Sequence, residues 1–291
     1  MNRIFTAAWL AITLLLGACS APREEITFAL KPDKDPDKML EERGALEAFL
    51  SERLGRPVSV TIPTSGSVIL EGFANGTIDA GYISATEMTY ARTDNSASLL
   101  LAGEIDGNPH YKSYWVSLKE KPYNSVDDLR GKPIAFSSRT STSGFIIPFW
   151  DLHEKGLLKK GDQPEDFFGK GNVWYGIGYV SAIEQVLAGD AEAAAVSYYV
   201  LDEDRHLTSD QKTKLKKVAE QGPVPTHVIA ASNHLTDQEK AELREALLSF
   251  NAPEHTELRD KLFTSKLIEV QPDEHLNSIS EAIELARNVA P

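Results

Sequence analysis

Short apolar runs alternate along the chain with longer segments in which apolar residues recur at helical spacing. A brief apolar or alternating stretch between turn residues predicts a strand, and a period near 3.6 predicts a helix. The short runs predict strands at 26–30, 58–62, 114–118, 133–136, 193–200 and 228–231. The helical spacing predicts helices at 39–54, 67–75, 144–154, 181–187, 236–250 and 279–289, with a polar connection at 157–173 and a break at 222–225. This alternation predicts an α/β fold.

One pattern occurs twice, at residues 73–84 and 186–197. Each copy has a helix end, a glycine, an acidic turn and a small-residue strand that ends in a serine, Ser84 or Ser197. Ligands of open α/β sheets bind outside the carboxyl ends of the strands. The repeat therefore predicts two α/β lobes that face a shared ligand cleft, although helix–turn–strand units are also common without this relation.

The first residues have the pattern of a secretory leader. Residues 4–16 are mostly apolar but too few to span a bilayer comfortably. The sequence LGAC at 16–19 closes this stretch, and its cysteine is Cys19. Small residues before a cysteine at this place form a lipobox, and the polar stretch that follows disfavours a buried helix. We predict an extracytoplasmic protein that contacts a membrane only through its lipid anchor, with a signal peptide at 1–18, a lipid on Cys19 and a tether at 19–25.

Composition narrows the possible functions. The remaining chain of about 270 residues is long enough for two lobes. A net charge of −13 argues against nucleic acid or an anionic surface as a partner, and it requires local neutral donors for any bound anion. Cys19 is the single cysteine, so no disulfide forms within the chain. The histidines are not spaced as metal ligands, and there is no nucleotide loop or nucleophile elbow, so we expect no metal, no cofactor and no catalysis.

The segment 131–148 carries the most chemical information, because it reads as a strand, a hydroxyl-rich loop and a helix start. Ser141, Thr142 and Ser143 would add hydroxyl donors to the free N–H groups of the first helical turn. Gly144 would let the backbone approach a ligand closely. These neutral donors predict a site for a small tetrahedral oxyanion. The simpler interpretation, in which the hydroxyls only cap the helix, stays open.

This part of the chain resembles a known family. Residues 128–132, the strand at 134–136 and the Ser-Thr-Ser-Gly-Phe sequence from Ser141 are similar to the phosphonate/phosphite-binding subunits of ABC importers. Weaker similarities extend over nearly the whole mature chain, at 78–82, 111–114 and 186–196. The resemblance implies an α/β, type II periplasmic-binding-protein fold, in which two crossover strands join the lobes. It places lobe 1 at 26–113 and 226–291 and lobe 2 at 114–225.

The resemblance also implies roles for single side chains. The hydroxyls of the 141–143 loop would bind the phosphonyl or phosphate oxygens, and Tyr111 falls at a cleft tyrosine. Tyr179 falls where many members have a ligand-contacting histidine, and Tyr198 flanks the same site. Ser197 stands where members that bind an aminoalkyl phosphonate have an aspartate.

The chain departs from the family pattern in three ways. The first-lobe tyrosine is absent, since Gly66 or Ser67 occupies its place, and Ser138-Arg139 stands where Asp-Pro is usual. Without the acidic partner at position 197, a ligand ammonium would be buried unpaired, which disfavours an aminoethyl ligand. Arg139 either adds a charge-assisted contact to the oxyanion or faces solvent.

The sequence therefore predicts a monomeric solute-binding protein that delivers a small oxyanion, of the phosphonate, phosphite or phosphate type, to an ABC permease. Ser84 and Thr86 of the first lobe would close over an oxyanion held by the second lobe. Three other functions stay open: an accessory that reports its ligand to a membrane kinase, an enzyme on this scaffold, and binding of a larger organic anion.

Overall fold

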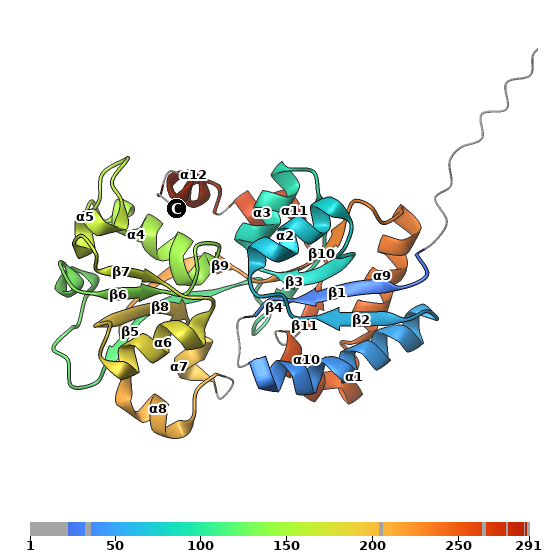
Figure 1. Ribbon diagram of the computed structural model, residues 1–291, viewed down its shortest axis with the longest axis horizontal. Helices are drawn as coiled ribbons and strands as arrows, with labels where there is room; N and C mark the ends of the chain where they lie inside the picture. Colours follow the sequence, from blue (N-terminus) through green and yellow to red (C-terminus); the bar gives the residue numbers. More distant parts are fainter. Residues whose placement is uncertain are drawn as a thin grey trace, which may run out of the picture.

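The computed structural model describes residues 23–32, 36–203, 206–263, 266–277, 279–287 and 289. Two β-sheets lie side by side, each with helices on both faces, and they form two lobes (Figure 1). The predicted signal peptide and Cys19 lie outside the described residues. Within the described ranges, no helix is both long and apolar enough to cross a membrane.

The first lobe is built on a six-stranded sheet. Its strands, in spatial order, are β11 (Lys266–Ile268), β4 (Ala97–Glu104), β10 (Val228–Ser232), β3 (Ala80–Ile83), β1 (Ile26–Leu30) and β2 (Val58–Thr61). Strands β1, β2 and β3 are parallel, whereas β10 runs antiparallel to both of its neighbours, β3 and β4. A strand from late in the chain therefore lies inside a sheet that begins at residue 26.

Helices cover both faces of this sheet (Figure 1). One face carries α1 (Pro36–Leu54), α9 (Asp237–Ser249), the short η3 (Pro253–His255) and α10 (Thr256–Leu262); the other carries α2 (Gly66–Asn75), α3 (Ala85–Thr93) and α11 (Pro272–Asn277). Successive side chains of a strand point to opposite faces. Accordingly, Phe28 and Leu30 pack in the cluster with α1 and α9, while Ala29 packs in the cluster with α2 and α3.

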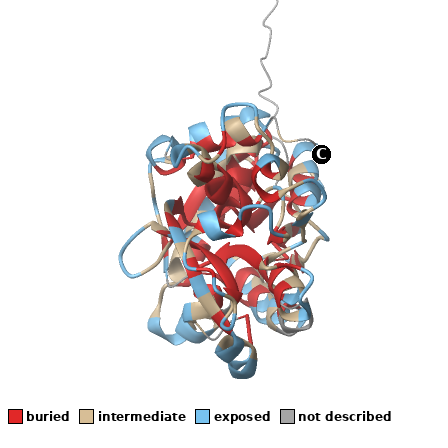
Figure 2. Cartoon of the chain, turned by 90° about the vertical axis from the view of Figure 1, so that its left-hand side faces the viewer, coloured by how far each residue is buried: buried red, intermediate tan, exposed pale blue. Residues whose placement is uncertain are grey.

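The second lobe is built on a five-stranded sheet. Its strands, in spatial order, are β7 (Val173–Tyr175), β6 (Ile134–Phe136), β8 (Ala193–Ser197), β5 (His110–Leu118) and β9 (Leu215–Pro225). Its helices are η1 (Val126–Leu129), η2 (Thr142–Ile146), α4 (Ile147–Glu154), α5 (Pro164–Phe168), α6 (Tyr179–Ala188), α7 (Tyr199–Asp202) and α8 (Ser209–Lys214). Trp115 packs with α4 and α5, and Tyr114 and Val116 pack with α6 and α7. Buried residues concentrate in the interior of the molecule, and exposed residues lie at its surface (Figure 2).

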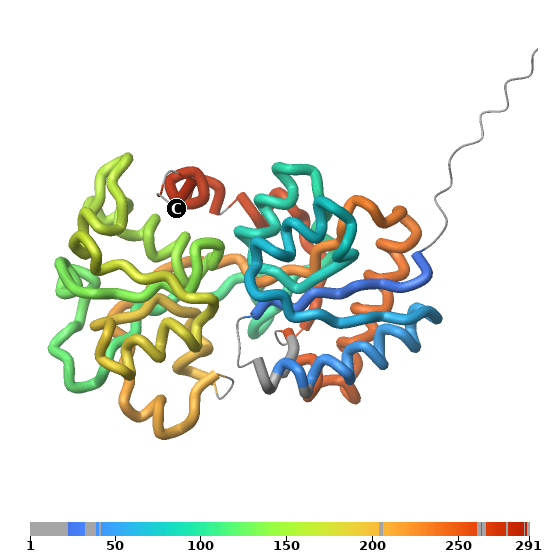
Figure 3. Tube along the Cα trace, viewed as in Figure 1, coloured from blue at the N-terminus to red at the C-terminus, as the bar shows by residue number. Residues whose placement is uncertain are grey.

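Two neighbouring segments join the lobes, 105–109 between β4 and β5 and 226–227 between β9 and β10 (Figure 3). Thr226 links them, because its backbone N–H donates to Pro109 O at 3.0 Å and its Oγ1 donates to Gly103 O at 2.7 Å. This arrangement of two α/β lobes with paired crossings is the type II fold that the resemblance implied.

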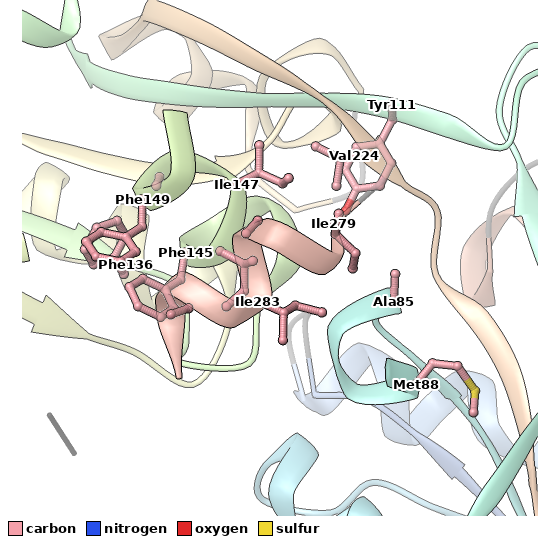
Figure 4. Packing of buried hydrophobic residues seen from close by; sticks show 14 of the residues in the cluster. Ala85, Met88, Tyr111, Phe136, Phe145, Ile147, Phe149, Val224, Ile279 and Ile283 are labelled. Carbon is pink, nitrogen blue, oxygen red and sulfur yellow. The ribbon is translucent and has the colours of Figure 1, made fainter. Parts of the chain in front are cut away.

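The chain crosses between the lobes a third time near its end, through α12 (Ser280–Ala286). Ile279 and Ile283 belong to one apolar cluster with Phe145 and Ile147 of the second lobe and Ala85 of the first (Figure 4). The predicted division assigns 26–113 and 226–291 to the first lobe and 114–225 to the second. Two segments assigned to the first lobe contact the second. Strand β5 already pairs in the second sheet from His110 onward, and α12 packs against α4.

Three predictions for single elements are wrong. The polar connection at 157–173 contains α5, whose Phe167 and Phe168 are buried. The strand predicted at 193–200 ends at Ser197, because Tyr198 takes a helical backbone conformation and α7 begins. The break predicted at 222–225 lies within β9. This strand is at the edge of the sheet, where a proline is tolerated because one side of the strand has no neighbouring strand that needs its N–H groups.

Glu239 of α9 binds the segment that precedes the first strand. The residue is 4% exposed. Its carboxylate accepts hydrogen bonds from the backbone N–H groups of Arg23 and Thr236, both at 2.8 Å, and contacts the Arg56 guanidinium at 3.1 Å. Burial raises the pKa of this carboxyl, but the hydrogen bonds outweigh burial and lower the pKa to about 2.

The pKa of Glu239 predicts an acid-dependent loss of stability. A carboxyl with a depressed pKa contributes stability above its unfolded pKa and loses that contribution as pH falls through the folded pKa. We expect the free energy of unfolding to fall between about pH 4.5 and pH 2, and to fall less steeply in Glu239→Gln. Urea unfolding at a series of pH values measures this difference. Parallel curves for the two proteins would contradict it.

Candidate functional site

The hydroxyl-rich loop follows β6 and opens η2, a π-helical turn that continues into α4. Ser141 caps this turn, since its Oγ accepts a hydrogen bond from Gly144 N at 3.0 Å. A Cβ added to Gly144 would lie 2.4 Å from Ser137 Cβ, so the turn can pass this close to β6 only with glycine. Ser141, Thr142 and Ser143 are all buried.

The Ser143 hydroxyl meets two phenols. Tyr111 OH donates to Ser143 Oγ at 3.1 Å, and Tyr179 OH lies 2.9 Å from the same oxygen. Burial, with the Tyr179 phenol close by, raises the pKa of Tyr111 well above its ordinary value, so Tyr111 stays a neutral donor. Three hydroxyls, from β5, η2 and α6, therefore converge at Ser143.

A second layer of polar side chains holds the loop against the sheet. Ser113 Oγ donates to the carbonyl of Ser143 at 2.6 Å, and Gln221 Nε2 donates to Ser113 Oγ at 2.8 Å. We did not predict these two residues. The available signal was that Ser113 lies two positions after Tyr111, and so on the same face of its strand.

Thr142 meets the first lobe directly. Thr86 N donates to Thr142 Oγ1 at 3.2 Å, and the two threonine hydroxyls lie 3.0 Å apart. Ser84 Oγ lies 3.1 Å from the carbonyl oxygen of Thr140, to which it can donate. Ser84 and Thr86 lie where β3 ends and α3 begins, so the structure brings these two first-lobe residues to the hydroxyl loop.

The other predicted residues take different positions. Ser197 ends β8 opposite Ser113, is fully buried, and its Oγ has no hydrogen-bond partner within the described ranges. Tyr198 OH donates to Glu203 Oε1 at 2.9 Å, and its ring centre lies 6.1 Å from that of Tyr111. The Arg139 guanidinium lies 3.9 Å from the centre of the Tyr175 ring, in a cation–π contact.

A charged pair that we did not predict lies beside the loop. Lys31 Nζ lies 3.0 Å from Glu87 Oε1, and Thr140 Oγ1 donates to the same oxygen at 2.7 Å. The side chains of Lys31 and Glu87 are 6% and 0% exposed. Glu87 had a sequence signal, because it stands three residues after Ser84 as in a capping box, and the structure shows that box.

Two α/β lobes joined by paired crossings, with neutral donors gathered where the lobes meet, define a two-lobed solute-binding protein. A family model described as "ABC transporter, phosphonate, periplasmic substrate-binding protein" matches residues 28–276. The chain belongs to this family. An extracytoplasmic location follows from that membership.

Individual relatives agree with the family. The phosphate-import protein PhnD of Mycolicibacterium smegmatis is 26% identical over an alignment of 207 residues, which covers 66% of this chain but only 64% of that protein. PhnD1 from Prochlorococcus marinus, solved with methylphosphonate, superposes with a TM-score of 0.80 at 18% identity, over 91% of this chain and 99% of that one. A binding protein of a phosphonate ABC transporter from Pseudomonas aeruginosa gives 0.79 at 17%, over 90% and 86%. These two structures confirm the fold.

Proposed function

We propose that this chain is the substrate-binding component of an ABC importer and that it captures a small oxyanion of the phosphonate, phosphite or phosphate type. One observation carries the proposal: the hydroxyls of Ser143, Tyr111 and Tyr179 converge beside Ser141 and Thr142 where the lobes meet. Neutral O–H and N–H donors can hold an oxyanion without a basic field, as a chain with net charge −13 requires. When the ligand binds, its oxygens would accept the hydrogen bonds that the hydroxyl oxygens of Ser143 and Thr142 accept in this structure.

The relatives and the charges around the loop support this ligand class. One relative is named a phosphate-import protein, and another was solved with methylphosphonate. Ser197 brings no charge, and Glu87, the carboxylate bonded to Thr140, is already paired with Lys31. A ligand ammonium would be buried beside the loop without a carboxylate of its own, which is costly. We therefore propose a ligand without an amine.

Titration calorimetry tests the proposal. The mature chain is titrated with phosphate, phosphite and methylphosphonate, with sulfate as a tetrahedral control and 2-aminoethylphosphonate as the amine control. We expect saturable binding of at least one of the first three ligands, and weaker binding of the amine. If none of the three binds at millimolar concentration, the proposed ligand class is wrong.

Attachment to a membrane through a lipid on Cys19 completes the proposal, and we infer that the protein acts as a monomer. Replacement Cys19→Ser removes the thiol that would carry the lipid. We expect the native chain in the membrane fraction and the variant in the soluble extracytoplasmic fraction, with a lipid mass on the native chain only. Equal partition of the two proteins would contradict the anchor.

A further inference from the structure

Lys31 and Glu87 lie at the strand edge where this fold class binds ligands. Lys31 is the first residue after β1, and Glu87 lies in the first turn of α3, directly after β3. Strands β1 and β3 are adjacent and parallel, so their carboxyl ends lie together. Ligands of open α/β sheets bind outside these ends. The pair is therefore at the edge of the first lobe that meets the hydroxyl loop.

The two members of the pair differ in how far they are satisfied. The Glu87 carboxylate accepts hydrogen bonds from Ser84 N at 2.8 Å, from Thr140 Oγ1 at 2.7 Å, and lies 2.9 Å from Ser84 Oγ. Lys31 Nζ, with three N–H donors, has Glu87 as its one recorded partner within the described residues. A buried ion pair is costly to desolvate, so a buried pair at the edge where ligands bind indicates a role beyond stability.

Gly66 makes the space for this carboxylate. A Cβ added to Gly66 would lie 1.7 Å from Glu87 Oε1 and 2.5 Å from Glu87 Cδ, so no other residue fits here while Glu87 keeps its position. The family resemblance places a first-lobe tyrosine at Gly66 or Ser67. In this chain the Glu87 carboxylate, paired with Lys31, occupies the space beside the loop that a side chain at position 66 would otherwise enter.

We propose that Lys31 is a charged ligand-binding residue of the site and that Glu87 positions its ammonium. Together the two charges determine how tightly the site binds a negatively charged oxyanion. This inference rests on the proposed function. Lys31 and Thr140 share one oxygen of Glu87, so the ammonium lies next to the loop that holds the neutral donors. When an oxyanion binds, the ammonium donates to it, while the Glu87 carboxylate repels it and limits the affinity.

The two charges have opposite expected effects, and this separates ligand binding from a purely structural role. We expect Lys31→Met to weaken methylphosphonate or phosphate binding by about 10- to 100-fold, the effect of losing one charge-assisted hydrogen bond. We expect Glu87→Gln to tighten binding several-fold, because the amide oxygen keeps an acceptor for both Lys31 and Thr140 while the negative charge that repels the ligand is removed. If the pair only fastened the lobes together, both variants would weaken binding alike.

The full mature chain and these variants are compared by calorimetry, with melting temperatures recorded in parallel. The matched controls are Lys214→Met and Asp210→Asn, which break an exposed pair at 2.6 Å and change the net charge equally. If Lys31→Met is too unstable, the double variant Lys31→Met/Glu87→Gln leaves no unpaired buried charge and must still bind less tightly than Glu87→Gln.

Each outcome decides the question. Opposite shifts in the two single variants, or the stated order of the double variant, support the inference. Unchanged affinity in the Lys31 variants, or equal weakening by both single changes, overturns it and leaves the proposed function intact. If the unaltered chain binds none of the probe oxyanions, the proposed function fails, and the inference fails with it.

Discussion

Replacing Ser143 with alanine is expected to weaken binding of methylphosphonate or phosphate by about 10- to 100-fold. The change removes the hydroxyl at the centre of the donor cluster and takes from the buried phenols of Tyr111 and Tyr179 their shared partner. Ser143 Oγ fixes the positions of both phenols, and without it they are buried and unpaired. The remaining donors are then less well placed for the ligand. Calorimetry with both ligands measures the effect.

The control for this prediction is Ser209→Ala, which removes an exposed hydroxyl from the first turn of α8. Its affinity should equal that of the unaltered chain. Tyr111→Phe provides a second comparison, because it removes one donor and keeps the ring. Equal affinities for the Ser143 variant and the Ser209 control would show that the hydroxyl cluster does not bind the ligand.

Replacing Gly144 with alanine is expected to lower the melting temperature by about 2–12 °C and to abolish measurable oxyanion binding. The new Cβ would lie 2.4 Å from Ser137 Cβ and 2.7 Å from Ser141 Oγ, and neither contact can be relieved by rotating a long side chain. Ser137 is itself fixed, since its Oγ donates to Ala195 O at 2.7 Å. The turn must therefore open, which moves the donors of residues 141–143.

Gly44→Ala is the matched control for the steric argument. Gly44 lies inside α1, and an added Cβ would meet nothing within 4 Å. Alanine favours a helix over glycine by up to about 1 kcal/mol, so this variant should melt at the same temperature or higher. A Gly144 variant that melted and bound like the Gly44 variant would contradict the close packing at Ser137.

Much of the fold could be predicted from local patterns. The strand at 26–30 and the capping box of Thr236 and Glu239 depend on neighbouring residues only, and the structure has both. Strand β9 was missed because it carries lysines and prolines, and its strand character depends on pairing with β5 at the sheet edge. Helix α5 was missed because it is short and its two phenylalanines show no helical period.

The candidate site divides in the same way. The hydroxyls of residues 141–143 stand out in the sequence because donor residues follow one another at a helix start. The pair of Lys31 and Glu87 has no such local pattern, since its members are far apart in sequence and meet only because β1 and β3 are adjacent. The space left by Gly66 could be recognised only from coordinates. The local chemistry of the loop was therefore predictable, and the contact between Lys31 and Glu87 was not.

The place of β10 between β3 and β4 has a consequence for how the protein is made. A polypeptide emerging from its N-terminus supplies β1 to β4 first, yet β10 must be inserted between two of these strands before the sheet is complete. The sheet of the second lobe needs only residues 110–225, which are continuous. Since domains generally fold as units during synthesis, we expect the second lobe to fold before the first, although its residues are synthesised later. The first lobe would then stay unfolded, and accessible to chaperones and proteases, until translocation of the chain is nearly finished.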